Sequence, residues 1–211
     1  MRVVGHRGWA ARYPDNRLEG ILAARAVSSM VEVDVRRTST GELVLSHDPV
    51  DDDQHLVRLV ELLAEIGDFP LNIEIKNFPG EPGFEPHHET GLATAAQARP
   101  FDLLTCFFWP TVDEIHRNYP DVSTGVVVDR DWDLELAATH ALVLGHRFLV
   151  PHWSLALAHA ETTKQAVGQG LEVVVWTLND PGQVPELASL GVSAIITDDP
   201  GTMTAALEGP M

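Results

Sequence analysis

Short apolar runs alternate along the chain with segments whose apolar residues recur at helical spacing. Nine runs have the length and aliphatic content typical of β-strands: 2–5, 30–35, 42–46, 71–76, 102–107, 123–128, 147–151, 172–177 and 193–198. Helices are expected over 17–29, 55–67, 91–99, 112–120, 134–145, 154–170 and 184–191. Strands that alternate with helices predict βα units and a parallel sheet.

One connection is too short to join two parallel strands. Residues 36–41 alone separate the runs 30–35 and 42–46, whereas a parallel crossover needs about a dozen residues. Residues 42–46 are therefore expected to form the return arm of an antiparallel hairpin whose turn lies near Ser39. The remaining eight strands predict a compact α/β fold, a (β/α)8 TIM barrel that forms one domain over residues 1–211. An open doubly wound sheet is the alternative.

The run VEVDVRR carries two acids on one face. Side chains alternate along a strand, so Glu32 and Asp34 point one way and the valines between them point the other. Taken alone, paired acids are more typical of a solvated strand face than of a metal site. In a TIM barrel, however, the carboxyl ends of the strands form the active site. The residues expected there are His6, Arg7, Glu32, Asp34, Glu74, Lys76, His152, Trp176 and Asn179.

The hairpin is expected to return His47 to the level of Glu32 and Asp34. Together with Glu74, these acids would place three carboxylates in one barrel mouth, where burial and mutual repulsion are costly. A divalent cation removes that cost, and all-oxygen ligation favours Mg²⁺ or Ca²⁺ over zinc. The sequence thus predicts a cation site flanked by His6 and His47.

Charge and composition restrict the partners. The formal net charge of −17 repels nucleic acid and anionic membranes, so neither is an expected partner. The single cysteine, Cys106, excludes an internal disulfide and lies in an apolar run, so it is expected in the core. The chain opens directly on a strand-like run and has no apolar stretch of membrane-spanning length. We expect a cytoplasmic protein without stable membrane insertion.

Four blocks, in order along the chain, resemble the glycerophosphodiester phosphodiesterase family. GHRGWAARYPDN (5–16) resembles its H-R-G…P-E-N motif, and EVDVRRTSTGELVLSHDP (32–49) resembles its E-x-D-V-x-x-T-x-D-G-x-x-V-x-x-H-D block. LNIEIKN (71–77) is similar to the third block, and VVVWTLN with GVSAIITDDP (173–200) is similar to the last. The match covers nearly the whole chain; the spider-toxin phospholipase D group is similar but more distant.

The resemblance implies a metal-dependent hydrolase that cleaves glycerophosphodiesters, which are small molecules of lipid and glycerol metabolism, to sn-glycerol 3-phosphate and an alcohol. It implies that one divalent cation, Mg²⁺ or Ca²⁺, is held by three carboxylates, those of Glu32, Asp34 and Glu74. It implies that His6 and His47 act as general acid and base. It also implies that Arg7 and Lys76 bind phosphate oxygens and that Trp176 lines the pocket against the alcohol. His152 is added as a substrate contact because it lies at a strand end. The choice of metal, the alcohol, the order of the histidines and the oligomeric state stay open.

The chain departs from the family pattern in three places, one of which is the acidic loop 48–54 after His47. The P-E-N-T motif reads Pro14-Asp15-Asn16-Arg17, so Asp15 is expected to support the site at most, and Asn16 is interpreted as a helix N-cap. The connection over 48–70 has room for one loop and one helix, so the family's capping insertion is expected to be absent.

A missing cap leaves the substrate's alcohol undefined. Either the Gly- and Pro-rich loop 77–90 or a partner would cover the mouth, or the open mouth would admit bulkier diesters. A lysophospholipase D-type activity is therefore an alternative. A non-catalytic barrel that binds a phosphate ester or a cation is a further one, although binding alone needs no pair of histidines such as His6 and His47. Lesser alternatives are a second cation site in the acidic loop 48–54, substrate contacts from His87 and His88, and a mouth position for Trp109, which otherwise packs in the core.

Overall fold

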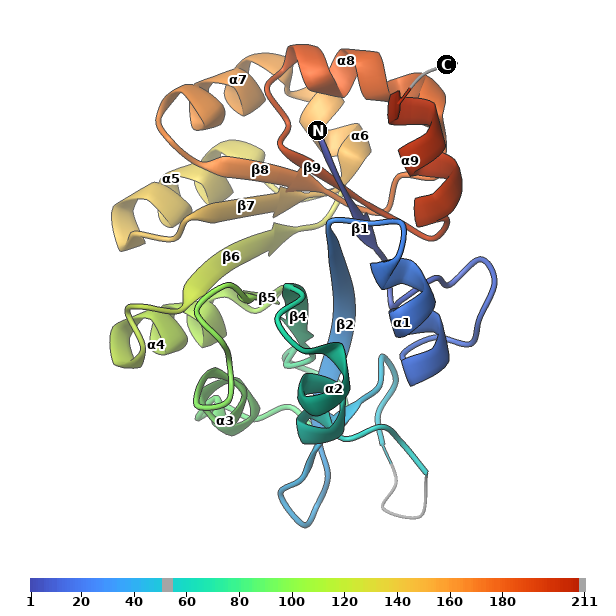
Figure 1. The fold of residues 1–211 in the computed structure, drawn as a ribbon. Coiled ribbons are helices and arrows are strands. Elements are labelled where there is room, and N and C mark those ends of the chain that lie inside the picture. The colour runs from blue at the N-terminus through green and yellow to red at the C-terminus, as the bar shows by residue number, and fades with distance from the viewer. Residues whose placement is uncertain (51–54, 209–211) are drawn as a thin grey trace.

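Eight parallel strands close into a barrel in the computed structural model, which describes residues 1–50 and 55–208 (Figure 1). The strands are β1 (Arg2–Gly5), β2 (Met30–Arg37), β4 (Leu71–Ile75), β5 (Leu103–Cys106), β6 (Ser123–Val128), β7 (Phe148–Pro151), β8 (Glu172–Val175) and β9 (Ala194–Thr197). Each pairs in parallel with the next, and β1 pairs with both β9 and β2, which closes the circle. The predicted (β/α)8 barrel is confirmed, and the open sheet is excluded.

Helices surround the barrel. They are α1 (Leu18–Arg25), α2 (Leu59–Ile66), α3 (Glu89–Ala95), α4 (Trp109–Asn118), α5 (Leu134–Leu144), α6 (Trp153–Ala158), α7 (Ala160–Gly168), α8 (Val184–Ser189) and α9 (Pro200–Glu208), with a 3₁₀ turn, η1 (Pro181–Gln183). The expected helix 154–170 is divided because His159 has the non-helical angles φ −115° and ψ 49°. Helix α9 was not predicted, since its first residues are the weak helix formers Pro, Gly and Thr. In the described part of the chain, no helix has both the length and the apolar character that crossing a membrane requires.

The predicted hairpin is present. Strand β3 (Leu43–Leu45) runs antiparallel to β2, with Val35 opposite Leu45. The Ser46 N–H donates to the Asp34 carbonyl oxygen at 3.1 Å, which continues the ladder toward His47. Among the described residues between β3 and β4, α2 is the one helix. The expected short connection without a capping insertion is therefore confirmed. Part of the acidic loop considered as a second cation site, 51–54, lies outside the described residues.

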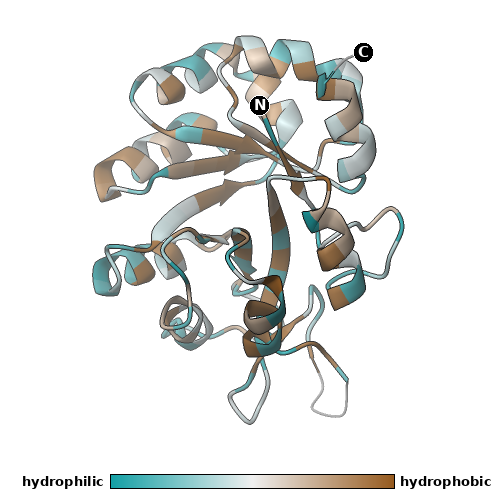
Figure 2. Ribbon diagram, viewed as in Figure 1, coloured by the Kyte–Doolittle hydropathy of each residue, from teal (hydrophilic) through white to brown (hydrophobic). Residues whose placement is uncertain are grey.

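The two sides of the barrel wall have different chemistry. On the outer side, Val31, Val33 and Val35 of β2 are fully buried under the helices. On the inner side, a second apolar cluster includes Val4, Leu103, Phe148, Val174 and Ala194. Figure 2 shows the strands as mostly hydrophobic, with hydrophilic residues within β2. The interior of the barrel thus contains an apolar cluster as well as the polar mouth.

Two residues that the sequence associates with the core are packed there. Cys106 is fully buried with its Sγ 3.1 Å from the Ile75 carbonyl oxygen, and burial raises the pKa of its thiol to about 12. Trp109 packs against the main core cluster, and its indole N–H donates to the Val127 carbonyl oxygen at 2.8 Å. The core position of Cys106 is confirmed, and for Trp109 the structure favours packing over a place at the mouth.

The packing of β7 can be tested with a matched pair of leucines. Leu149 on β7 is fully buried, whereas Leu136 on α5 is 59% exposed. Leu149→Ala removes buried atoms and leaves a cavity, so we expect the free energy of unfolding to fall by about 3 kcal/mol. Leu136→Ala should change it by less than about 0.5 kcal/mol. Urea denaturation followed by circular dichroism measures both, and equal losses would contradict the assigned packing.

Candidate active site

Three carboxylates converge at the barrel mouth. Strands β2 and β4 pair with Asp34 directly beside Glu74, and Glu32 lies two residues before Asp34 on the same face. One oxygen from each of the three carboxylates lies within 4.8 Å of the others. The side chains of Glu32 and Asp34 are each 2% exposed. The structure therefore brings together the three acids that the sequence predicted, and it buries two of them.

Glu32 is the acid whose negative charge is least compensated by neighbouring groups. Burial, together with the charges of Asp34 and Glu74, raises its pKa to about 8. Its Oε2 accepts the Arg7 backbone N–H at 2.8 Å, whereas its buried Oε1 has no hydrogen-bond partner among the described residues. A buried carboxylate oxygen without a partner is costly, and ligation of a cation would remove that cost. The all-carboxylate donor set fits Mg²⁺ or Ca²⁺.

Two cationic side chains flank Asp34. Lys76 Nζ lies 2.6 Å from Glu74 Oε1 and 3.2 Å from Asp34 Oδ1. Arg7 Nε lies 3.2 Å from Asp34 Oδ2, an ion-pair distance without hydrogen-bond geometry. Burial opposes ionisation of Asp34, but the charges of Lys76 and Arg7 outweigh it and lower the pKa of Asp34. Asp34 and Glu74 are thus paired, while the nearest ion-pair partner of Glu32 in the described chain is an imidazole, His6.

His6 is held by an aspartate that the sequence analysis did not single out. His6 Nδ1 lies 2.6 Å from Asp198 Oδ1, and the Asn179 amide donates to Asp198 Oδ2 at 2.6 Å. His6 Nε2 lies 4.0 Å from Glu32 Oε2, so this nitrogen faces the acids. Burial lowers the pKa of His6, but the Asp198 contact and the charge of Glu32 outweigh burial, and the net shift is upward. The signal for Asp198 was its place directly after β9, the neighbour of β1 in a closed barrel.

The interpretation of Asn16 as a helix N-cap is wrong. Helix α1 begins at Leu18 with Arg17 in the N-cap position, and Asn16 is buried instead against Asp34. Its Nδ2 donates to Asp34 Oδ2 at 2.9 Å, and its Oδ1 accepts the Asp34 N–H at 3.1 Å. Arg7 and Asn16 have φ angles of 50° and 57°. Such strained backbone in non-glycine residues is typical of functional sites. Arg7 also donates to Asp15 at 2.8 Å, in keeping with the supporting role expected of Asp15.

His47 lies at the rim. Its side chain is 43% exposed, and its Nδ1 lies 2.8 Å from Asp48 Oδ1. The buried Arg36 guanidinium donates to the His47 carbonyl oxygen at 2.9 Å, which fixes the return arm of the hairpin. Among the described residues, no hydrogen bond or ion pair joins His47 to the three acids. His47 therefore approaches the cluster from the solvent side.

Two hollows lie on either side of the acids. One, of about 460 Å³, is lined by His47 and Lys76 and has aromatic walls formed by Phe78, Phe107 and Trp132. The other, of about 560 Å³, is polar; its lining residues include His6, Arg7, Asp15, Asn179 and Asp198. Because Lys76 and Arg7 both pair with Asp34, the carboxylates lie between these hollows. The geometry suits a ligand with two substituents, one that contacts aromatic side chains and one that contacts polar side chains.

The loop 77–90 forms part of the aromatic wall. Asn77 is buried at the end of β4; its amide donates to the Glu85 carbonyl oxygen at 3.0 Å and its Oδ1 accepts the Glu85 N–H at 2.8 Å. Phe78 stacks on Trp132 with ring centroids 6.3 Å apart. His88, with Nδ1 3.0 Å from Thr111 Oγ1, is occupied at the start of α3. The loop is fixed to the barrel and borders the hollow where a cap is missing.

Trp176 and His152 lie next to the mouth but are occupied by structural contacts. The Trp176 indole donates to the Val150 carbonyl oxygen at 3.0 Å, and its ring lies edge-on to Phe107. His152 caps α6 and its Nδ1 lies 2.7 Å from Ser154 Oγ, while burial and the nearby charge of Arg130 lower its pKa. Neither residue lines the two hollows. Their roles as substrate contacts stay predictions.

Comparison with known proteins decides the family. The model of the glycerophosphoryl diester phosphodiesterase family matches residues 6–103 and 103–202. The chain belongs to this family. The resemblance drawn from the sequence motifs is therefore confirmed, and so is the enzyme class that it implied at the level of the family.

Relatives of this family share both length and fold. A glycerophosphodiester phosphodiesterase of Caldanaerobacter subterraneus is 22% identical over 95% of each chain. A phosphodiesterase of Oleispira antarctica, solved in complex with the product sn-glycerol-3-phosphate, has a TM-score of 0.84 at 19% identity and covers 99% of this chain and 97% of that one. The glycerophosphodiester phosphodiesterase of Thermotoga maritima has a TM-score of 0.79 at 23% identity over 95% of both chains. At these identities the solved structures establish the common fold.

The contact between Asp198 and His6 gives a test of the site's electrostatics. Because Asp198 favours the protonated imidazole, Asp198→Asn should lower the pKa of His6. Asp199→Asn is the matched control, since the Asp199 carboxylate accepts from Trp9 and Thr202 and should leave His6 nearly unchanged. NMR titration of the imidazole protons, without divalent cations, measures both variants. A His6 pKa that does not move in Asp198→Asn would contradict the contact.

Proposed function

We propose that this chain is a metal-dependent hydrolase that cleaves glycerophosphodiesters to sn-glycerol 3-phosphate and an alcohol. The observation that carries the proposal is the cluster of Glu32, Asp34 and Glu74, two of them buried, in which Glu32 Oε1 lacks a hydrogen-bond partner among the described residues. Membership of the family supports the reaction class. The Oleispira antarctica relative, solved with sn-glycerol-3-phosphate, supports the product.

Glu32, Asp34 and Glu74 would hold one divalent cation, Mg²⁺ or Ca²⁺. When bound, such an ion supplies positive charge that offsets the negative charge of a phosphodiester. Arg7 and Lys76 extend this compensation, because each borders one of the two hollows and pairs with Asp34. Local cations are needed for an anionic substrate, since the chain as a whole carries a formal net charge of −17.

His6 and His47 would transfer the protons. Each has its Nδ1 next to an aspartate, Asp198 for His6 and Asp48 for His47, which leaves Nε2 for the substrate. One imidazole would accept the proton of the neighbouring glycerol hydroxyl as its oxygen bonds to phosphorus. The other donates a proton to the alcohol oxygen as its bond to phosphorus breaks. The alcohol leaves a cyclic phosphate, which one water would then open to sn-glycerol 3-phosphate, with the two imidazoles exchanging roles as proton donor and acceptor, so that atoms and charge balance.

The two hollows would take the two arms of the diester. The aromatic hollow, with Phe78, Phe107 and Trp132, offers apolar contact to an alcohol larger than glycerol. Loop 77–90 serves as its wall in place of a cap, because Asn77 and Glu85 tie that loop to β4. Phe78 is 38% exposed at this rim, and this apolar exposure favours lysophospholipids as the second candidate substrates.

Activity of wild type and His6→Ala tests the proposal. Wild type should release sn-glycerol 3-phosphate with Mg²⁺ or Ca²⁺ and not with EDTA. His6→Ala should lower kcat by about 10²- to 10⁴-fold, the range that a positioned acid or base contributes. A coupled assay of glycerol 3-phosphate over glycerophosphodiesters of choline, ethanolamine and glycerol, together with free-alcohol release from lysophospholipids, identifies the alcohol.

His159→Ala is the matched control, because His159 is exposed between α6 and α7 and should keep the wild-type rate. Equal rates for His6→Ala and wild type would exclude the acid–base role. Cleavage of lysophospholipids alone would replace the first candidate with the second. No turnover of any substrate by a protein that still binds the cation would favour the non-catalytic barrel.

A further inference from the structure

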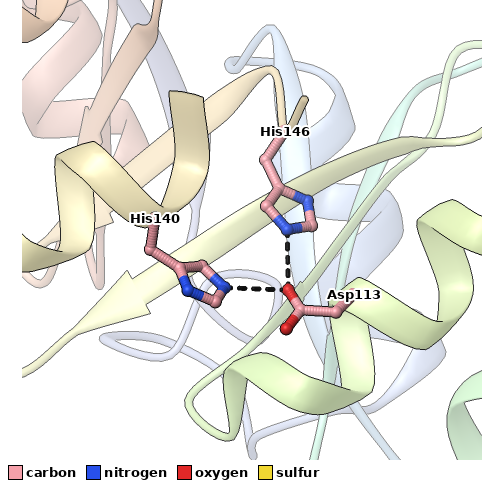
Figure 3. Close-up of side chains that lie close together, drawn as sticks. All are labelled: Asp113, His140 and His146. Carbon is pink, nitrogen blue, oxygen red and sulfur yellow. Dashed lines mark hydrogen bonds and ion pairs between the residues drawn. The ribbon is translucent and has the colours of Figure 1, made fainter. Parts of the chain in front are cut away.

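A second group of metal-ligating side chains lies outside the active site. Asp113 on α4, His140 on α5 and His146 after α5 converge, as Figure 3 shows. The Nε2 atoms of His140 and His146 each lie 2.9 Å from the same oxygen, Asp113 Oδ1. One ligand atom from each residue lies within 4.8 Å of the other two. Three segments of the chain thus direct two imidazoles and a carboxylate to one point.

This cluster is separate from the catalytic machinery. His146 comes two residues before β7, and its Nδ1 lies 2.8 Å from the hydroxyl of Thr124, the second residue of β6. The cluster therefore lies by the amino ends of these strands, whereas His6 and Asp198 follow the carboxyl ends of theirs. In a TIM barrel, the amino-terminal face contributes to stability rather than to catalysis.

We propose that Asp113, His140 and His146 form a structural site for a transition metal of the zinc type, which links α4 to α5. Two imidazole nitrogens and one carboxylate are ligands that Zn²⁺ accepts, in contrast to the all-oxygen set of Glu32, Asp34 and Glu74. Zinc binds nitrogen and oxygen at about 2.0–2.1 Å, so neighbouring ligands of a tetrahedral site lie roughly 3.3 Å apart. The present N···O distances of 2.9 Å are close to that spacing.

The surroundings of the cluster have the features of a metal site. The His146 side chain is fully buried and its second nitrogen is held by Thr124 Oγ1, the kind of outer contact that orients a metal-bound imidazole. The His140 ring packs against Trp109 with centroids 5.0 Å apart. His140 is 24% exposed and Asp113 is 15% exposed, so one side faces solvent. An ion can enter from that side, and water can complete its coordination.

The segment between α5 and β7 has a backbone suited to this placement. Gly145 ends α5 with a φ of 82°, and a β-carbon there would lie 3.1 Å from His116 Nε2. Glycine thus allows the chain to turn closely past α4 and present His146 to Asp113. His116 has its ring 5.6 Å from that of His146 but does not belong to the ligand group, which makes it a control.

Counting bound zinc tests the proposal. Each protein is equilibrated with Zn²⁺ in excess Mg²⁺, dialysed, and analysed by atomic emission. The proteins compared are wild type, Asp113→Asn, His140→Ala and His116→Ala. Asp113→Asn and His140→Ala should each hold one equivalent of zinc less than wild type, and His116→Ala should hold as much as wild type. Thermal melts should show a zinc-dependent rise in Tm for wild type and His116→Ala alone, because the metal binds the folded state.

Thr124→Val provides a variant outside the ligand set, in case Asp113→Asn or His140→Ala fails to fold. Losing the hydroxyl that orients His146 should weaken zinc binding by about 10- to 100-fold. Equal zinc content in wild type, Asp113→Asn and His140→Ala would overturn the proposal, as would an unchanged affinity in Thr124→Val. The same loss in His116→Ala as in His140→Ala would overturn the assigned ligands. These outcomes do not depend on phosphodiesterase activity.

Discussion

The repulsion among three carboxylates at the mouth of the barrel is the constraint on which the site depends. Their oxygens lie within 4.8 Å of one another, and two of the acids are almost fully buried. Two like charges about 4 Å apart repel by about 4 kcal/mol at the effective dielectric constant of a protein surface. Burial, together with this repulsion, raises the pKa of Glu32 to about 8. Arg7, Lys76 and Asn16 compensate the charges of Asp34 and Glu74. Among the residues that the structure describes, one oxygen of Glu32 has no hydrogen-bond partner.

The barrel keeps the acids together despite this repulsion. Strands β2 and β4 place Asp34 beside Glu74 through backbone pairing, and the apolar outer faces of the same strands are locked under helices. The turn after β1 brings the Arg7 N–H to Glu32, and Gly8, with a φ of 95°, lets it pass α1, since a β-carbon would lie 2.8 Å from Gly20. The favourable free energy of core packing thus offsets the unfavourable repulsion among the three carboxylates.

Local rules of sequence predicted the residues at each strand end but not all of their contacts. Strand alternation placed Glu32 and Asp34 on one face, and the hairpin register returned His47 toward them. Asn16 was misassigned because its local preference for a helix cap competes with a bond to Asp34, 18 residues away. Asp198 was missed because its contact with His6 spans 192 residues and exists only once β9 closes on β1.

The same limit applies to the aromatic hollow and to the cluster of Asp113, His140 and His146. Phe78 and Trp132 are brought together by two loops, and no periodicity in the sequence relates them. His140 and His146 are six residues apart, but their common partner lies on the preceding helix, α4. Such sites depend on how neighbouring βα units pack, which the pattern of one segment does not contain.

Calorimetric titration of Mg²⁺ and Ca²⁺ into wild type and Glu32→Gln tests the central claim most directly. If the acids are arranged for a cation, wild type binds one ion per chain. Glu32→Gln should then bind that ion about 10- to 100-fold more weakly. Glu65→Gln is the matched control, because it removes the same charge from the exposed side of α2. It should bind both ions with the affinity of wild type. Equal affinity of wild type and Glu32→Gln for both ions would contradict the account.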